Sequence, residues 1–228
     1  PELSRGLGDV YKRQILYMTF PLYISLFILS KNQIFEMIFL VVIVLTNIIL
    51  GFSLLKNKFF SFSLLKNRFI GHVYLVGSLV LFCSIPNIDD FYNPYLVFCF
   101  LALIWVSDSA AYVFGVTFGK RPLFKSVSPK KSIEGFLGGL IFSIILSLIF
   151  FKYLNLDLSL SEWITLGILT SCLGTLGDLV QSQFKREAGV KDSGKWLPGH
   201  GGLYDRMDSI IFASPFIYLS LIIFKNVS

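Results

Sequence analysis

Residues 182–208 read SQFKREAGVKDSGKWLPGHGGLYDRMD, a polar segment between two strongly apolar ones. The segment interleaves basic residues (Lys185, Arg186, Lys191, Lys195, Arg206) with acids (Glu187, Asp192, Asp205, Asp208). Carboxylates bind hard divalent cations, basic side chains bind phosphate, and glycine lets a backbone approach a phosphate closely. A cytoplasmic loop that only sets membrane topology would explain the positive charges. It would not explain the interleaved acids or the Gly-His-Gly-Gly turn at 199–202.

The composition indicates a membrane protein. The chain has 228 residues, of which 54% are hydrophobic and 24 are Phe. Its mean hydropathy is +0.71, well above that of ordinary soluble domains. The net charge of +6 could suggest a nucleic-acid partner. However, the basic residues cluster in short loops beside apolar runs, so topology and lipid or nucleotide phosphates explain them better, and no nucleic acid is expected.

The predicted fold class is all-α, a polytopic integral membrane protein with about seven transmembrane helices. The apolar runs lack strand alternation and are long, and lipid admits only helices or closed barrels. They cover residues 15–30, 34–55, 70–85, 95–116, 136–154, 164–181 and 209–224. Residues 1–14, PELSRGLGDVYKRQ, are polar and lack an initiating Met, so we interpret them as a non-native leader. This leaves open whether the native N-terminus is missing.

The charge pattern predicts the orientation of the loops. Loops 56–69, 117–135 and 185–206 hold most of the Lys and Arg residues, and the alternate loops hold few. Positive charge marks cytoplasmic loops, so we expect these three to face the cytosol. The three cysteines, Cys83, Cys99 and Cys172, lie in apolar runs, and we expect no disulfide.

The acids at helix ends are the strongest candidates for chemistry. Asp178 lies in the last turns of an apolar run, where an ionised group is costly unless it faces a cavity or a partner, or already lies at the interface. Asp178, Ser182 and Lys185 share one helix face by their spacing. Asp205 and Asp208 stand at the entry to the next helix, where acids are also ordinary first-turn residues. Three converging carboxylates would repel unless a cation lay between them.

A second polar region spans the end of one run and the loop after it. Asp108 interrupts an apolar run, again at a cost that favours function or pairing. Gly115 and Gly119 are four apart and predict close helix packing rather than a phosphate cradle. Lys130 and Lys131, in SPKKS, are equally explained as phosphate ligands or as topology charges.

These motifs resemble one enzyme family. Ser-x-Phe-Lys-Arg at 182–186, Lys-Asp-x-Gly at 191–194 and LPGHGGLYDRMD at 197–208 together resemble the phosphatidate cytidylyltransferase (CDP-diacylglycerol synthase) signature. Residues 128–139 are similar to a second block of that family, and the likeness covers about residues 95–224. It implies a membrane nucleotidyltransferase that makes CDP-diacylglycerol and pyrophosphate from CTP and phosphatidate, with aspartate-bound magnesium. Members are usually longer at the N-terminus.

From the residues and the resemblance we predict N-terminal transmembrane helices over 15–94 and a catalytic transmembrane region over 95–228. The predicted catalytic residues are Asp178, Asp205, Asp208, Lys185 and Arg186. The predicted substrate-binding residues are Ser182, Lys191, Asp192, His200, Gly201, Gly202, Arg206, Asp108, Lys130 and Lys131. The predicted metal ligands are Asp178, Asp205 and Asp208, holding Mg²⁺, with a second cation left open. For His200 we favour a binding or structural role over proton transfer.

The expected partners are CTP, phosphatidate drawn from the bilayer, and the membrane itself, with a homodimer left open. The expected location is the bacterial inner membrane, with the active site facing the cytosol. Two rival functions remain. A CTP-dependent lipid kinase or a related lipid cytidylyltransferase could share this architecture. An ion-coupled transporter could use Asp108 and Asp178 along an ion path, but the acids cluster at one side and we find no inverted repeat.

Overall fold

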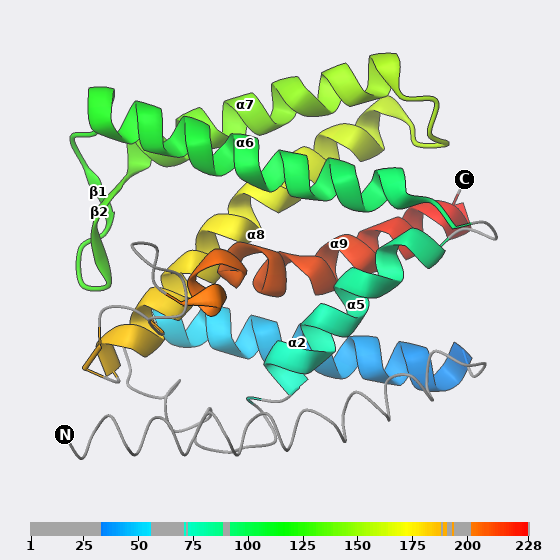
Figure 1. The fold of residues 1–228 in the computed structure, drawn as a ribbon, viewed down its shortest axis with the longest axis horizontal. Helices are drawn as coiled ribbons and strands as arrows, with labels where there is room; N and C mark the ends of the chain where they lie inside the picture. The colour runs from blue at the N-terminus through cyan, green and yellow to red at the C-terminus, as the bar shows by residue number, and fades with distance from the viewer. Residues whose placement is uncertain are drawn as a thin grey trace.

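The computed structural model describes residues 33–55, 71, 73–88, 92–187, 189, 190, 193 and 202–227. Within these residues, five helices are long and apolar enough to cross a membrane. They are α2 (Gln33–Leu55), α6 (Pro94–Phe118), α7 (Ile133–Tyr153), α8 (Leu160–Glu187) and α9 (Asp208–Val227) (Figure 1). The prediction of a polytopic, helical membrane protein is therefore confirmed. The predicted leader, 1–14, and the first apolar run, 15–30, lie outside the described residues.

Within the described residues, the third predicted span is divided into three short elements. They are a π-helix, η1 (Val73–Gly77), the helix α5 (Ser78–Ser84) and a 3₁₀ turn, η2 (Ile85–Asn87). Together these elements extend about 22 Å at 1.5 Å per residue. Pro86 lies in the final turn, as expected for a helix stop. At Gly77 an added Cβ would lie 2.7 Å from Ile43 Cδ1, so this short segment packs tightly against α2.

A β-hairpin joins α6 to α7, a feature that the sequence did not predict. β1 (Pro122–Phe124) and β2 (Ser128–Ser132) pair antiparallel, with Pro122 opposite Ser132. The Glu134 carboxylate, in the first turn of α7, accepts hydrogen bonds from the backbone N–H groups of Lys120 and Arg121 at 3.1 and 3.2 Å. The Ser132 hydroxyl caps α7 by accepting from the Gly135 N–H at 3.1 Å. These bonds fix the base of the hairpin to both helices.

Small residues bring α6 and α7 into backbone contact. A Cβ at Gly135 would lie 2.7 Å from the Ala111 carbonyl oxygen, and one at Gly119 would lie 2.8 Å from the Ser132 hydroxyl. A Cβ at Gly115 would lie 3.9 Å from the Gly135 Cα. The prediction of close helix packing is confirmed for Gly115, because a Cβ at Gly135 would lie 3.1 Å from the Gly115 Cα and only small residues allow backbones to approach this closely. Gly119 follows α6 as its C-cap and faces the Ser132 side chain rather than the backbone of α7.

The crossing of α8 and α9 is equally close. A Cβ at Gly177 would lie 2.6 Å from both the Asp208 carbonyl oxygen and Phe212 Cβ. One turn earlier, the Ser209 hydroxyl donates to the Gly174 carbonyl at 3.1 Å. The first turn of α9 is thereby held against the α8 turn that carries Asp178.

The helix ends that border the basic loops lie at one end of the bundle. In Figure 1 the last turns of α2, α6 and α8 and the first turns of α7 and α9 all lie toward the left. The alternate connections and the C-terminus lie toward the right. This arrangement agrees with the alternation of charge along the sequence, and the assignment of that end to the cytosol stays a prediction.

Candidate active site

Three aspartates from three helices lie within electrostatic range of one another. Asp108 comes from α6, Asp178 from α8 and Asp208 from α9, and the charges of Asp178 and Asp108 both act on Asp208. The hairpin contributes Lys131, which forms an ion pair with Asp178 and acts electrostatically on the other two. We call these four residues the acidic cluster. It gathers one chemical group from each of four elements that are far apart in sequence.

The acidic cluster is open on one side. Asp208 is 8% exposed, whereas the side chains of Asp178 and Lys131 are 35% and 29% exposed, and Asp108 is exposed. The Ser182 hydroxyl donates to Asp178 Oδ1 at 3.3 Å, so the predicted shared face of α8 is confirmed for this pair. Asp208 also accepts from the Ser209 N–H at 2.8 Å, as an acid in a first helical turn commonly does.

Asp205 has a separate set of partners. Its Oδ1 accepts from Gln181 Nε2 and from Lys185 Nζ, each at 3.0 Å. Its Oδ2 accepts from the Ser193 N–H and hydroxyl, each at 2.9 Å, and from the Gly202 N–H at 3.0 Å. Burial alone would raise the pKa of Asp205, but these hydrogen bonds outweigh it and hold the pKa below its usual value.

The structure therefore does not bring together the three acids predicted as metal ligands. Asp108, rather than Asp205, interacts with Asp178 and Asp208. Among the described residues, no three His, Cys, Asp or Glu side chains lie close enough as they stand to hold a metal ion. The ligand set Asp178, Asp205 and Asp208 stays a prediction, and the structure adds Asp108 as a neighbour of two of its members.

The remaining predicted residues fall into two groups. Lys130, Arg186 and Arg206 are exposed at the same end of the bundle, and Gly202 donates to Asp205. Lys191, Asp192, His200 and Gly201 lie outside the described residues, so their roles stay predictions.

Sequence reasoning missed two partners of Asp205, namely Gln181 and Ser193. Gln181 could have been found, because it is four residues before Lys185 and both can then reach one acceptor from the same helix face. Gln181 is fully buried, so its amide depends on Asp205 for a hydrogen-bond partner. Ser193 offered no comparable signal, since only the path of the loop brings it to Asp205.

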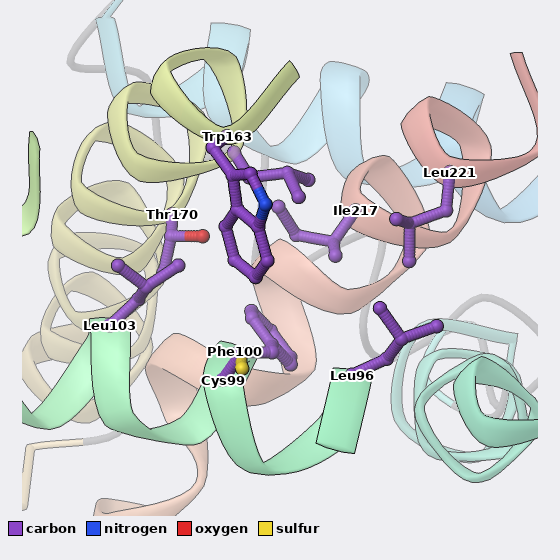
Figure 2. Close-up of a pocket in the computed structure, with 9 residues that line it drawn as sticks. Leu96, Cys99, Phe100, Leu103, Trp163, Thr170, Ile217 and Leu221 are labelled. Carbon is purple, nitrogen blue, oxygen red and sulfur yellow. The ribbon is translucent and has the colours of Figure 1, made fainter. Parts of the chain in front are cut away.

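An apolar pocket lies elsewhere in the bundle, between α6, α8 and α9 (Figure 2). Its lining comprises Leu96, Cys99, Phe100, Leu103, Trp163, Leu166, Thr170, Ile217 and Leu221. Trp163 and Thr170 point into it and are each 1% exposed, and Nε1 and Oγ1 have no hydrogen-bond partner among the residues that the structure describes. Trp163 precedes Asp178 by fifteen residues of α8, or about 22 Å along the helix axis. This pocket is therefore separate from the acidic cluster.

Comparisons with known proteins give a family match and several similar proteins. A model of the cytidylyltransferase family matches residues 7–224. A phosphatidate cytidylyltransferase of Staphylococcus saprophyticus is 46% identical over 128 residues, which cover 56% of this chain and 49% of the relative. A phosphatidate cytidylyltransferase of Staphylococcus aureus strain COL is 47% identical over 130 residues, with the same coverage of both chains. The chain thus spans about half the length of the curated relatives it matches.

The family match covers nearly the whole chain, including all the described helices and every member of the acidic cluster. On this ground the chain belongs to the cytidylyltransferase family.

Proposed function

We propose that this protein joins CTP and phosphatidate to give CDP-diacylglycerol and pyrophosphate. A phosphate oxygen of phosphatidate attacks the α-phosphorus of CTP, a new P–O–P bond forms, and the bond between the α-phosphorus and the bridging oxygen to the β-phosphate breaks. Pyrophosphate leaves with that oxygen. No side chain has to act as nucleophile, because the attacking oxygen already carries negative charge. The relatives' names and the family support this reaction.

One observation carries the proposal: three aspartates and a lysine from four separate elements act on one another electrostatically, on helices whose ends border the basic loops. Phosphoryl transfer needs positioning and neutralisation of anions more than covalent catalysis. Lys130, Lys185, Arg186 and Arg206 lie at this same end and would bind the phosphates of CTP or of the lipid. The exposed side of the cluster would admit both substrates.

Magnesium fits the donor chemistry of the site. The acidic cluster supplies carboxylate oxygens, and Ser182 adds a hydroxyl beside Asp178, which are the hard ligands that Mg²⁺ prefers. Asp178 and Asp208 would hold the ion, with Asp205 or Asp108 as a further ligand. A bound magnesium ion would neutralise developing charge on the phosphates.

We further propose that the site faces the cytosol, where CTP is found, and that phosphatidate enters sideways from the bilayer. The charge distribution of the loops supports this orientation. The exposure of Asp108 on a membrane-spanning helix is consistent with a lateral approach of lipid.

The deciding experiment uses the purified chain in detergent with phosphatidate and CTP labelled at the α-phosphate. If the proposal is correct, the label appears in CDP-diacylglycerol and one pyrophosphate is released per turnover. A CTP-dependent lipid kinase would instead release labelled CDP and leave the lipid unlabelled. Absence of labelled lipid, with a folded protein and magnesium present, would refute the proposal.

A further inference from the structure

The hairpin presents two adjacent lysines that differ in their surroundings. Lys131 forms an ion pair with Asp178, whereas Lys130 is exposed and forms no ion pair with the described residues. Both lie in the part of β2 where the pairing with β1 is irregular, between the Phe124–Ser128 and Pro122–Ser132 pairs. Among the described residues, Lys131 and not Lys130 lies within ion-pair distance of Asp178. Two residues that are adjacent and identical in the sequence therefore have different partners in the structure.

Lys131 pairs with the carboxylate of Asp178, which a metal ion would need as a ligand. Asp178 accepts from Ser182 through one oxygen and pairs with Lys131 through the other. A divalent cation that bound Asp178 through the same oxygen as Lys131 would be repelled by the ammonium group, so its binding favours displacement of Lys131. When all three aspartates are ionised, Lys131 balances one of the three negative charges, and a divalent cation in its place would balance two.

The geometry allows the Lys131 side chain to move while the backbone of the hairpin stays in place. Its side chain is 29% exposed, so its ammonium group has room on the open side of the cluster. The base of the hairpin is held to α6 and α7 through Glu134 and Ser132. Lysine has a long flexible stem and carries a compact charge, so a rotamer change suffices to carry the ammonium a few ångströms.

We propose that Lys131 is an exchangeable counter-ion. It holds Asp178 before substrates bind, and it transfers to a phosphate of the nucleotide when a divalent cation takes the carboxylate. This inference rests on the proposed function, since the incoming phosphate is taken to be that of a nucleoside triphosphate. With all three aspartates ionised, the exchange changes the net charge of the cluster from −2 with Lys131 to −1 with one divalent cation. It also makes Lys131 a positioning residue that opposes metal binding in the absence of nucleotide and supports nucleotide binding in the presence of metal.

Two binding measurements test the exchange without turnover. The first titrates the full chain in detergent with Mn²⁺ in the absence of nucleotide, following free Mn²⁺ by electron paramagnetic resonance. Lys131→Gln removes the competing charge and is expected to tighten Mn²⁺ binding about three- to tenfold. Lys131→Arg should stay near wild type, because it restores the charge. Lys125→Gln, at an exposed lysine in the turn between β1 and β2, is the matched control and should change the affinity less than about twofold.

The second measurement titrates CTP in saturating magnesium without phosphatidate. Here Lys131→Gln is expected to weaken CTP binding about tenfold or more, the effect of losing one charged hydrogen bond to a phosphate. The opposite signs of the two effects separate exchange from a merely structural role, because a misfolded site would bind both ligands less well.

The outcomes are distinguishable from those of the proposed function. Unchanged or weaker Mn²⁺ binding by Lys131→Gln overturns the exchange, even where the wild-type protein makes CDP-diacylglycerol. Failure of every variant, wild type included, to bind Mn²⁺ overturns it as well. If the two opposite shifts occur and no CDP-diacylglycerol forms, the exchange stands and the lipid substrate assignment falls.

Discussion

Asp178 and Asp205 are both carboxylates at the polar end of the bundle, yet their environments differ in kind. Asp178 is half-exposed, and its strongest partner is a lysine on a flexible stem. The side chain of Asp205 is 12% exposed and accepts from five donors, two of them backbone N–H groups. Side-chain partners can be exchanged for a ligand at small cost, whereas backbone donors require the loop to move. This difference indicates that Asp178 can exchange its partner for a ligand, whereas Asp205 holds Ser193 and Gly202 to α8.

The largest expected effect is on turnover. Asp178→Asn keeps the size of the side chain and removes its charge, so it should lower kcat by about a hundredfold or more. The helices should still assemble, since they are held by packing rather than by this charge. Turnover is to be measured against magnesium concentration, with folding checked by size-exclusion chromatography. A folded variant with near-normal rate and magnesium dependence would remove Asp178 from the site.

The crossing that sets the distance between Asp178 and Asp208 can be altered directly. Gly177→Ala places a methyl group 2.6 Å from backbone of α9, so the helices must separate, at a cost of about 1–3 kcal/mol. Gly174→Ala is the matched control, because its Cβ would meet Ser209 Cβ at an ordinary 3.5 Å. We expect a clear drop in apparent melting temperature and in turnover for the first variant only. Equal behaviour of the two would show that the close crossing is unimportant.

The clamp formed by Asp205 should depend on pH. Its pKa is lowered in the folded protein, so its contribution to stability is present above the pKa of the unfolded chain, near 4. That contribution is lost as the pH falls through the lower, folded value. Asp205→Asn should therefore reduce the apparent melting temperature at neutral pH, and the gap from wild type should close in acid. A gap that is constant with pH would show that the charge of Asp205 is not what stabilises the loop.

If Asp205 is also a metal ligand, its replacement has a second consequence. Asp205→Asn should then weaken Mn²⁺ binding as strongly as Asp178→Asn does. If Asp205 acts only as a clamp, Mn²⁺ affinity in the absence of nucleotide should fall much less for Asp205→Asn than for Asp178→Asn. The ratio of the two affinities is thus the direct measure of how far the two aspartates differ.

The smallest effect is expected at Trp163 in the apolar pocket, about 22 Å from Asp178 along α8. Trp163→Phe removes an indole N–H that has no partner and leaves an aromatic ring in place. The apparent stability should change by less than about 1 kcal/mol, because lost packing is offset by removal of an unsatisfied donor. Turnover should be unaffected. A large loss of activity would show that the pocket and the acidic cluster are coupled.

Much of the membrane architecture could be predicted from the sequence. The long apolar runs correspond to α2, α6, α7, α8 and α9, because hydrocarbon excludes any other structure for such segments. The third run was harder, since a hydropathy pattern counts apolar residues and does not register the change from π-helix to α-helix after Gly77 or the 3₁₀ turn that contains Pro86. The hairpin was missed because β1 has only three residues and β2 consists of Ser, Pro and Lys, so neither strand has the alternation that marks a strand in sequence.

By itself the sequence determined which functional groups are available: carboxylates at helix ends, lysines in the loops, and glycines where helices meet. It could place Asp178, Ser182 and Lys185 on one face, because helical spacing is a local property. Only the tertiary structure decided which of these groups meet. It paired Lys131 rather than Lys130 with Asp178, and it placed Asp108 within electrostatic range of Asp208. It also made Gln181 and Ser193 hydrogen-bond donors to Asp205. The physical reason is that strand register, loop path and helix crossing depend on contacts between residues far apart in the chain, which no local pattern encodes.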